Sequence, residues 1–407
     1  MSMWRRALLL LAAVLAARTA AGAEDPAKAA AARRKSYEAA MAAAAETLDR
    51  ARQLPGARRE LALQALDLYR RASQDRPHEP DPHYHSGTVY ADLLHDPARA
   101  IAAWRQVRAL DPAYVHDPDM SFKLGIELSR LGRFTEAITE YDRASSYQAE
   151  IGRPDVVLGN SAEAAMGAGL LDEAIRRYRL ALAVPAIEPA STALHLFGLA
   201  VALDRDEQVY ASREIMRRAL DLDPHRASME PERGVFFVPD GDRHYYDGLA
   251  HLHAGRPPEA RYAFEQFLAV LPGDQYARRA RAHVAALAKD PRSRITPVPA
   301  EARLSDIVVP WIVDRGKVVP LIRKRAEALR ACRPTVPPFG PGSRARAAVS
   351  LAIDDRGRPM EAQVDGADRA VKGCVYKRVA AWRFPTAAFR SGARLSFAVT
   401  FAPRARR

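Results

Sequence analysis

The chain has 407 residues, of which 48% are hydrophobic and 27% are charged. This length is too great for one ordinary hydrophobic core, so we expect two or more domains, and the composition excludes a wholly disordered chain. The formal net charge is +13, and residues 300–407 hold 22 basic and 9 acidic side chains, whereas residues 24–299 hold 37 and 40. The basic C-terminal part bears on association and not on fold.

The first 23 residues have the pattern of a secretory signal. Arg5 and Arg6 precede an apolar run from Ala7 to Ala17, and Ala21-Gly22-Ala23 follows with the small-x-small pattern of a cleavage site. The apolar run is too short for a permanent membrane-spanning helix, although an uncleaved anchor is the alternative interpretation. We therefore expect residues 1–23 to be a signal peptide and the protein to be exported, with a periplasmic location.

Residues 24–45 are an Ala-rich leader, and residues 46–290 repeat one pattern. In the clearest copy, Gly248, Ala260, Phe264 and Pro272 follow one another at spacings of 12, 4 and 8 residues. A period of about 34 residues with this arrangement is typical of stacked helix–turn–helix units. It predicts about six units and a capping helix, forming a mainly α-helical solenoid.

This pattern resembles the tetratricopeptide repeat (TPR) family. The resemblance implies that the first helix of each unit faces a concave groove that binds a protein. The candidate groove residues are Lys123, Ile126, Asn160, Glu163, Tyr246 and Leu249.

Residues 291–339 contain several prolines and predict an extended linker followed by a helix over Val318–Ala331. In residues 340–403 the period changes. Alternating apolar residues over Ala347–Ile353 and over Leu395–Phe401 predict strands on either side of a helix. This order predicts a small α+β domain, and a basic tail follows at residues 404–407.

Three features of this domain resemble the C-terminal domain of TonB-type energy-coupling proteins, in particular the version in periplasmic gliding-motility proteins. They are D-x-x-G at Asp354–Gly357, a helical Cys374 and W-x-F-P at Trp382–Pro385. The resemblance implies a TonB-like domain with Trp382, Phe384 and Pro385 in its core. We expect its last strand, an edge formed by Leu395, Phe397, Val399 and Phe401, to dock a partner by strand addition.

The chain has two cysteines, Cys332 and Cys374, 42 residues apart. Export favours a disulfide between them, although two buried thiols or an exposed redox pair are alternatives. The spacing excludes a short zinc knuckle.

The sequence carries no motif for catalysis or for a cofactor. It lacks G-x-S-x-G, the P-loop, G-x-G-x-x-G after a strand, and H-E-x-x-H. Two groups of histidines, one at positions 78, 83 and 85 and one at 244, 251 and 253, lack the further ligands of a metal site. We therefore expect no catalytic residue, no metal, no cofactor and no small-molecule substrate.

These observations predict a non-enzymatic, exported scaffold that binds protein partners of unknown identity. The alternative is a cell-envelope module whose basic C-terminal region binds an anionic polymer or lipid surface. Nucleic acid is not expected, because the sequence offers no aromatic stacking platform.

Overall fold

The computed structural model describes residues 25–54, 57–147, 153–184, 189–230, 239, 241–310, 313–333, 335–336, 345–365, 369–386 and 393–403. The predicted signal peptide and basic tail lie outside these residues. The chain divides into two compact units, residues 1–191 and 192–407, which are described separately. No helix in the described ranges is long and apolar enough to cross a membrane.

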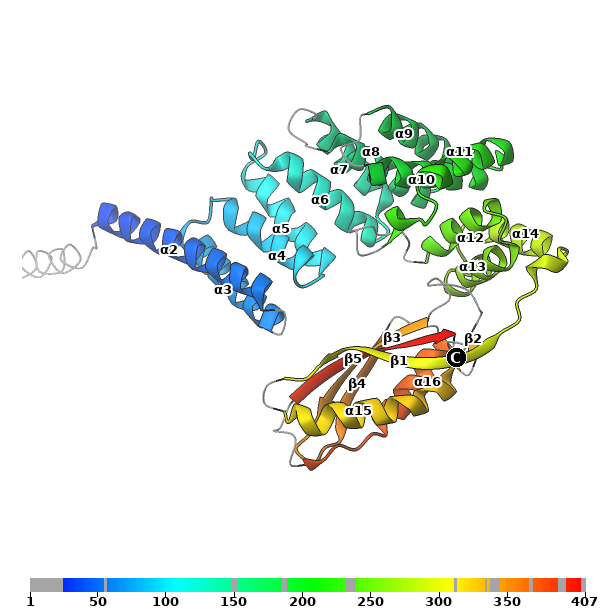
Figure 1. Ribbon diagram of the computed structural model, residues 1–407. Helices are drawn as coiled ribbons and strands as arrows, with labels where there is room; N and C mark the ends of the chain where they lie inside the picture. The colour runs from blue at the N-terminus through cyan, green and yellow to red at the C-terminus, as the bar shows by residue number, and fades with distance from the viewer. Residues whose placement is uncertain are drawn as a thin grey trace, which may run out of the picture. The chain divides into compact units, whose positions relative to one another are not determined.

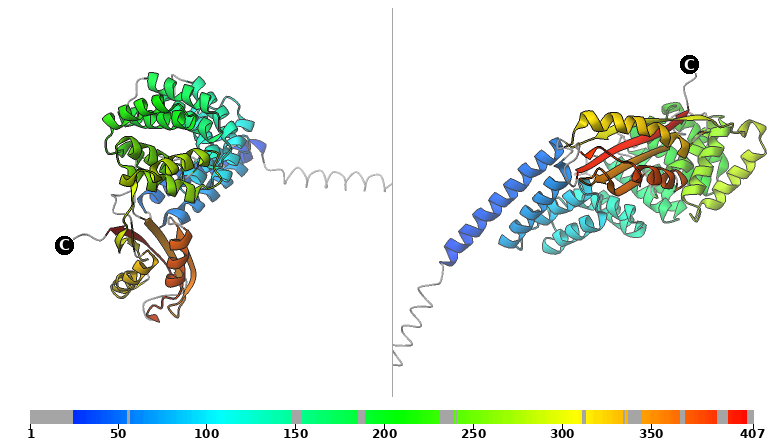
Figure 2. Two further views of the ribbon diagram at one scale, coloured as in Figure 1. Left: turned by 90° about the vertical axis from the view of Figure 1, so that its right-hand side faces the viewer. Right: turned by 90° about the horizontal axis from the view of Figure 1, so that it is seen from below.

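The first unit is a series of paired helices (Figure 1). Its helices are α2 (Pro26–Gln53), α3 (Arg58–Asp75), α4 (Asp81–Asp92), α5 (Pro97–Leu110), α6 (Asp117–Arg130), α7 (Phe134–Ser146), α8 (Pro154–Gly167) and α9 (Leu171–Ala183). Each even-numbered helix packs on the next, and the long blue pair α2 and α3 is seen in Figure 2. The prediction of stacked helix pairs is confirmed for this part of the chain.

The repeated residues have the packing roles that the sequence predicts. The second helix of a pair buries an alanine and, four residues later, an aromatic side chain: Ala100 and Trp104, Ala137 and Tyr141, Ala174 and Tyr178. Helix starts are set by proline and aspartate. Pro97, for example, follows Asp96, whose carboxylate accepts a hydrogen bond from the Arg99 amide at 3.1 Å.

The Ala-rich leader, whose sequence lacks a firm apolar stripe, is nevertheless helical. Residues 26–45 belong to α2, which continues without interruption to Gln53 and buries Ala44, Leu48 and Ala51. High helix propensity and packing of its C-terminal half on α3 together explain this continuity.

The second unit contains further helices and a sheet. The helices before the sheet are α10 (Pro189–Arg205), which begins just before the division, α11 (Val209–Leu222), α12 (Arg243–His253), α13 (Pro257–Val270) and α14 (Ala277–Ala288), with short 3₁₀ helices at Ala227–Met229 and Pro291–Ser293. The sequence predicts a short extended plug or a loop over the groove at residues 234–238, between the fifth and sixth repeat units, and this stretch lies outside the described residues.

The sheet has five antiparallel strands in the order β2-β1-β5-β3-β4 (Figure 1). The strands are β1 (Val298–Val308), β2 (Thr335–Val336), β3 (Ala345–Ile353), β4 (Pro359–Asp365) and β5 (Ala393–Pro403). Two helices, α15 (Arg315–Leu329) and α16 (Arg369–Ala380), share one hydrophobic core with the strands. The prediction of a small α+β domain is confirmed.

The two sequence motifs of this domain meet in the structure. Gly357 has a φ of +72°, and a Cβ at this position would lie 2.0 Å from the Phe384 carbonyl oxygen. The Gly357 carbonyl accepts a hydrogen bond from the Phe384 amide at 2.8 Å. Glycine is therefore required both by the backbone conformation and by the close approach of Phe384.

Trp382 and Phe384 are buried in the core, as predicted, but Pro385 is exposed. The segment is extended, so alternate side chains point to opposite sides, and Pro385 shares the outward side with Arg383. The prediction that Pro385 is a core residue is wrong.

The disulfide prediction is confirmed. Cys332 and Cys374 are bonded, with their Cα atoms 5.5 Å apart. Cys332 lies in the 3₁₀ helix Arg330–Cys332 that follows α15, and Cys374 lies in α16. The bond therefore joins the two helices that cover the sheet.

The prediction of an exposed last strand is wrong. β5 contains the predicted edge residues Leu395, Phe397, Val399 and Phe401, and it is paired on both sides. Its second neighbour is β1, which forms from the stretch predicted to be a linker. Ala302 lies opposite Phe401, and Leu304 opposite Val399. All four predicted edge residues lie on one face of β5 and are buried in the core that the sheet shares with α15 and α16.

Candidate protein-binding groove

The first helix of the third pair, α6, is held in place by a buried carboxylate at its N-terminus. Asp117 is 2% exposed and accepts hydrogen bonds from Arg108 Nη2 at 3.2 Å and from Arg143 Nε at 2.7 Å. Arg108 also donates to both carboxylate oxygens of Glu140, at 2.8 and 3.0 Å. Because these partners lie on α5 and α7, they fix the start of α6 between its two neighbours.

A close helix crossing fixes the middle of α6. A Cβ at Gly125 would lie 2.5 Å from the Tyr141 ring, which is fully buried on α7. A residue with a side chain does not fit at this position without displacing the ring. The backbone of α6 is therefore positioned closely against α7.

Four predicted groove residues lie in equivalent places on α6 and α8. Lys123 and Asn160 are separated by 37 residues, as are Ile126 and Glu163, and the starts of α6 and α8 have the same separation. All four side chains are partly exposed. Because α6 contacts α8, these residues form neighbouring positions of one surface, which we call the α6–α8 surface.

The charged groups of this surface have partners within the unit. Lys123 Nζ lies 2.9 Å from Asp119 Oδ2 and 5.7 Å from the centre of the Tyr84 ring. Tyr84 donates to the same Asp119 oxygen at 2.7 Å, and Tyr178 donates to Glu163 Oε2 at 2.5 Å. Burial and the Asp119 carboxylate raise the pKa of Tyr84, so it is a neutral hydrogen-bond donor.

An aromatic cluster beside Lys123 was missed by the sequence prediction. Tyr84 on α4 stacks on His116, with ring centres 5.2 Å apart, and also contacts Tyr114 at 5.5 Å. Tyr84 and Asp119 are 35 residues apart, and the spacing of the repeat predicts which helices pair but not which side chains meet. The cluster extends the α6–α8 surface toward α4.

The remaining two predicted groove residues do not belong to such a surface. Tyr246 and Leu249 on α12 are 1% and 0% exposed, so the prediction that they face a ligand is wrong. Large apolar side chains gain free energy from burial within their own unit, and here they are core residues.

Histidines of both groups noted in the sequence contact neighbouring side chains. His83 Nε2 lies 3.1 Å from Ser73 Oγ, and His85 stacks on Tyr69 at 5.5 Å. In the other group, His251 Nδ1 lies 3.3 Å from Arg226 Nη1. Among the described residues, no group of three or more His, Cys, Asp or Glu side chains could hold a metal ion.

No protein-family model and no curated protein matches the chain. Solved structures of helical-repeat proteins resemble parts of it. MamA from Desulfovibrio magneticus RS-1 is 17% identical and the match covers 45% of this chain and 97% of that one, with a TM-score of 0.38. Pseudomonas aeruginosa PilF is 16% identical, and the match covers 62% of this chain and 99% of PilF, with a TM-score of 0.40.

A tetratricopeptide repeat protein from Parabacteroides merdae ATCC 43184 is 15% identical. The match covers 51% of this chain and 73% of that protein, with a TM-score of 0.35. The TM-scores of these three structures are all below 0.5, so no conclusion about this chain is drawn from them.

Proposed function

We propose that this protein is a non-enzymatic scaffold that binds a protein partner through the α6–α8 surface. The proposal rests on four side chains that are partly exposed and occupy equivalent positions on two neighbouring helices. They are Lys123 and Ile126 on α6 and Asn160 and Glu163 on α8. Asp117 and Gly125 hold α6 in place, and Arg177 of α9 donates hydrogen bonds to Ser161 of α8 and to Asp142 of α7. A preorganised surface loses little conformational entropy on binding.

The residues of this surface favour a peptide segment of mixed character. Ile126 offers an apolar contact, Asn160 offers a donor and an acceptor, and Lys123 and Glu163 carry opposite charges. Because Lys123 and Glu163 already have partners in the unit, a ligand gains from shape and hydrogen bonding more than from net charge.

We further propose that the scaffold acts in the cell envelope after export. The signal-like pattern of residues 1–23 and the two bonded cysteines support this location. N-terminal analysis of the protein from periplasmic extracts should find a mature chain that begins at Glu24. A chain that retains residues 1–23 and fractionates with membranes would contradict export with cleavage.

A photo-crosslinking amino acid placed at Asn160 tests the proposed surface in intact cells. We expect a discrete crosslinked protein, identified by mass spectrometry. The matched control is Thr139, an exposed residue on α7, the second helix of the same pair as α6. The crosslinking amino acid at this position should give no such product. Equal crosslinking from both positions would show that the α6–α8 surface is not the binding site.

A further inference from the structure

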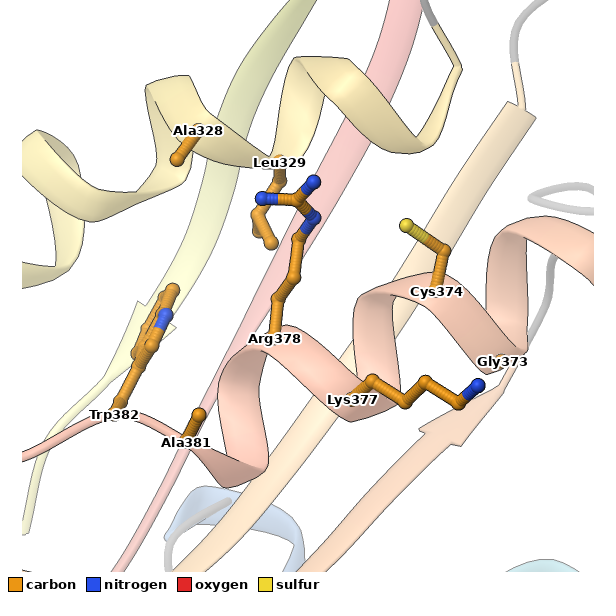
Figure 3. Close-up of a pocket in the computed structure, with 8 residues that line it drawn as sticks. All are labelled: Ala328, Leu329, Gly373, Cys374, Lys377, Arg378, Ala381 and Trp382. Atoms are coloured by element: carbon orange, nitrogen blue, oxygen red, sulfur yellow. The ribbon is translucent and has the colours of Figure 1, made fainter.

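The C-terminal α+β domain has a notch between its two helices, shown in Figure 3. The notch has a volume of about 830 Å³, within the range of small-molecule sites. It is lined by Ala328, Leu329, Gly373, Cys374, Lys377, Arg378, Ala381 and Trp382.

Most of the lining is apolar and firmly held. Trp382 stacks on Phe397 of the sheet with ring centres 5.5 Å apart and planes 8° apart. Leu329 is fully buried beneath the notch. Cys374 is bonded to Cys332 at the end of α15, so the two walls are covalently tied. The notch is therefore formed before any ligand arrives.

Two cations of α16 line this apolar space. Lys377 and Arg378 are exposed, and neither forms an ion pair with any residue that the structure describes. In Figure 3 the Arg378 guanidinium extends from α16 toward Leu329 on α15. By contrast, Lys372 on the same helix is paired with Asp365 at 3.2 Å.

No acidic side chain lines the notch to neutralise these charges. The acidic residue of α15, Glu327, is exposed beside the lining residue Ala328. Arg323, Lys324 and Arg330 are exposed on or just after the same helix, and the described residues offer them no ion pair. The notch thus combines an apolar lining with uncompensated positive charge.

We propose that the notch binds a single-chain anionic amphiphile, which is a ligand with one acyl chain and a carboxylate head. The chain would lie against Ala328, Ala381 and the accessible edge of Trp382, and the carboxylate would pair with Arg378. In Figure 3 the Lys377 side chain runs along α16 toward Gly373, so it would add positive charge beside the head group. Guanidinium and ammonium groups both suit an oxygen anion, and the aliphatic parts of their side chains can cover an acyl chain. This small-molecule site is separate from protein binding by the α6–α8 surface and does not depend on it.

Equilibrium dialysis of the full chain with radiolabelled dodecanoate, below its critical micelle concentration, tests the site. We expect saturable binding with one ligand per chain, and little binding of the neutral dodecyl maltoside. Saturation with equal affinity for both compounds would overturn the assignment of an anion site.

Variants test the cations and the apolar lining of the notch one at a time. The double variant Lys377→Ala/Arg378→Ala should bind dodecanoate about tenfold or more weakly, the effect expected for lost charge-assisted hydrogen bonds. Ala381→Trp keeps both cations but fills the apolar space, and it should abolish saturable binding. Lys372→Ala, on the same helix but paired with Asp365, is the matched control and should bind normally.

Thermal unfolding and thiol alkylation confirm that each variant is folded and retains its disulfide. Ala328→Trp provides a second space-filling variant from the other wall if Ala381→Trp does not fold. Dodecanoate binding that survives all of these substitutions would overturn the proposal. So would binding to phosphatidylglycerol vesicles, or to an acidic amphipathic peptide, in the absence of any dodecanoate binding.

Discussion

Helices α6 and α12 occupy the same position in the repeat but present different surfaces. Each has a glycine at its crossing with the following helix, Gly125 against Tyr141 and Gly248 against Phe264. In α6, Lys123 lies two residues before the glycine and Ile126 one residue after it, and both side chains are partly exposed. The equivalent residues of α12, Tyr246 and Leu249, are buried.

Position in a repeat therefore determines packing at the crossing but not the exposure of the residues beside it, because Ile126 is partly exposed whereas Leu249 at the same position is buried. Tyr246 and Leu249 on α12 are apolar and buried. Lys123 on α6, and Asn160 and Glu163 on α8, are polar and remain accessible. The proposed binding surface therefore lies in the first unit, and the two equivalent residues of α12 are core residues.

The largest expected effect concerns stability of the second unit. Arg205 and Asp242 form an ion pair whose side chains are 1% and 2% exposed, and the Arg205 guanidinium lies 4.1 Å from the centre of the Tyr276 ring. Arg205→Ala would leave a buried carboxylate uncompensated and should destabilise this unit by about 3–5 kcal/mol. Urea denaturation measures the loss.

The control for this prediction is Arg133→Ala, which removes an exposed ion pair with Glu136 in the first unit. Its unfolding midpoint should not change measurably, because exposed pairs contribute little. Equal losses in both variants would contradict the role given to the buried pair. Partner binding by the α6–α8 surface should be unaffected in either.

The second prediction is a loss of stability in acid caused by His251 on α12. Burial and the nearby Arg226 and Arg256 lower the pKa of His251 from 6.5 to about 3. Below pH 6.5 the unfolded chain therefore takes up a proton that the folded chain does not, and stability falls as the pH falls toward 3. At pH 4, which lies about 2.5 units below the unfolded pKa, the loss should be about 3 kcal/mol, since one pKa unit corresponds to about 1.36 kcal/mol.

His251→Gln isolates this effect from the titration of carboxylates. Glutamine can accept a hydrogen bond from Arg226 but does not titrate in this range. Denaturation at pH 7 and pH 4 should show a smaller acid loss in the variant than in the parent. The same acid loss in both would rule out His251 as its source.

The third prediction tests the close crossing in the first unit. Gly125→Ala brings a Cβ within 2.5 Å of the Tyr141 ring and should cost about 1–2 kcal/mol after the gain in helix propensity is subtracted. Gly373→Ala is the matched control, because a Cβ there meets nothing within 4 Å and should stabilise α16 slightly. Thermal unfolding of both variants measures the difference. A neutral Gly125→Ala would show that the crossing tolerates expansion.

The smallest expected effect on stability is that of Lys123→Ala. Its ion pair with Asp119 is partly exposed, so the loss should be at most about 0.5 kcal/mol. Partner affinity should nevertheless fall, because Lys123 lies on the α6–α8 surface. A large loss of stability would instead indicate that Lys123 is a structural residue.

The sequence predicted the helix pairs well because their packing is local. Ala137, Tyr141 and their counterparts recur at fixed spacing, and each contacts residues of the same or the adjoining pair. The disulfide was also predictable, since Cys332 and Cys374 are the two cysteines of the chain. The ion pairs of Asp117 were not, because three helices supply them.

The sheet was predicted less completely for a physical reason. β1 has a proline at Pro299 and no regular alternation of apolar residues, so its sequence resembles a linker. Its pairing with β5 joins segments roughly a hundred residues apart, which local patterns do not reveal. Once β1 occupies that side, β5 becomes an internal strand.

If partner binding depends on the partly exposed residues of α6 and α8, a bulky charged residue at Asn160 should block it. The affinity of the crosslinked partner can be measured for Asn160→Arg on α8 and for Thr139→Arg on α7. We expect at least a tenfold loss for Asn160→Arg and no change for Thr139→Arg, with both variants folded. Equal affinities for the two variants would contradict partner binding at the α6–α8 surface.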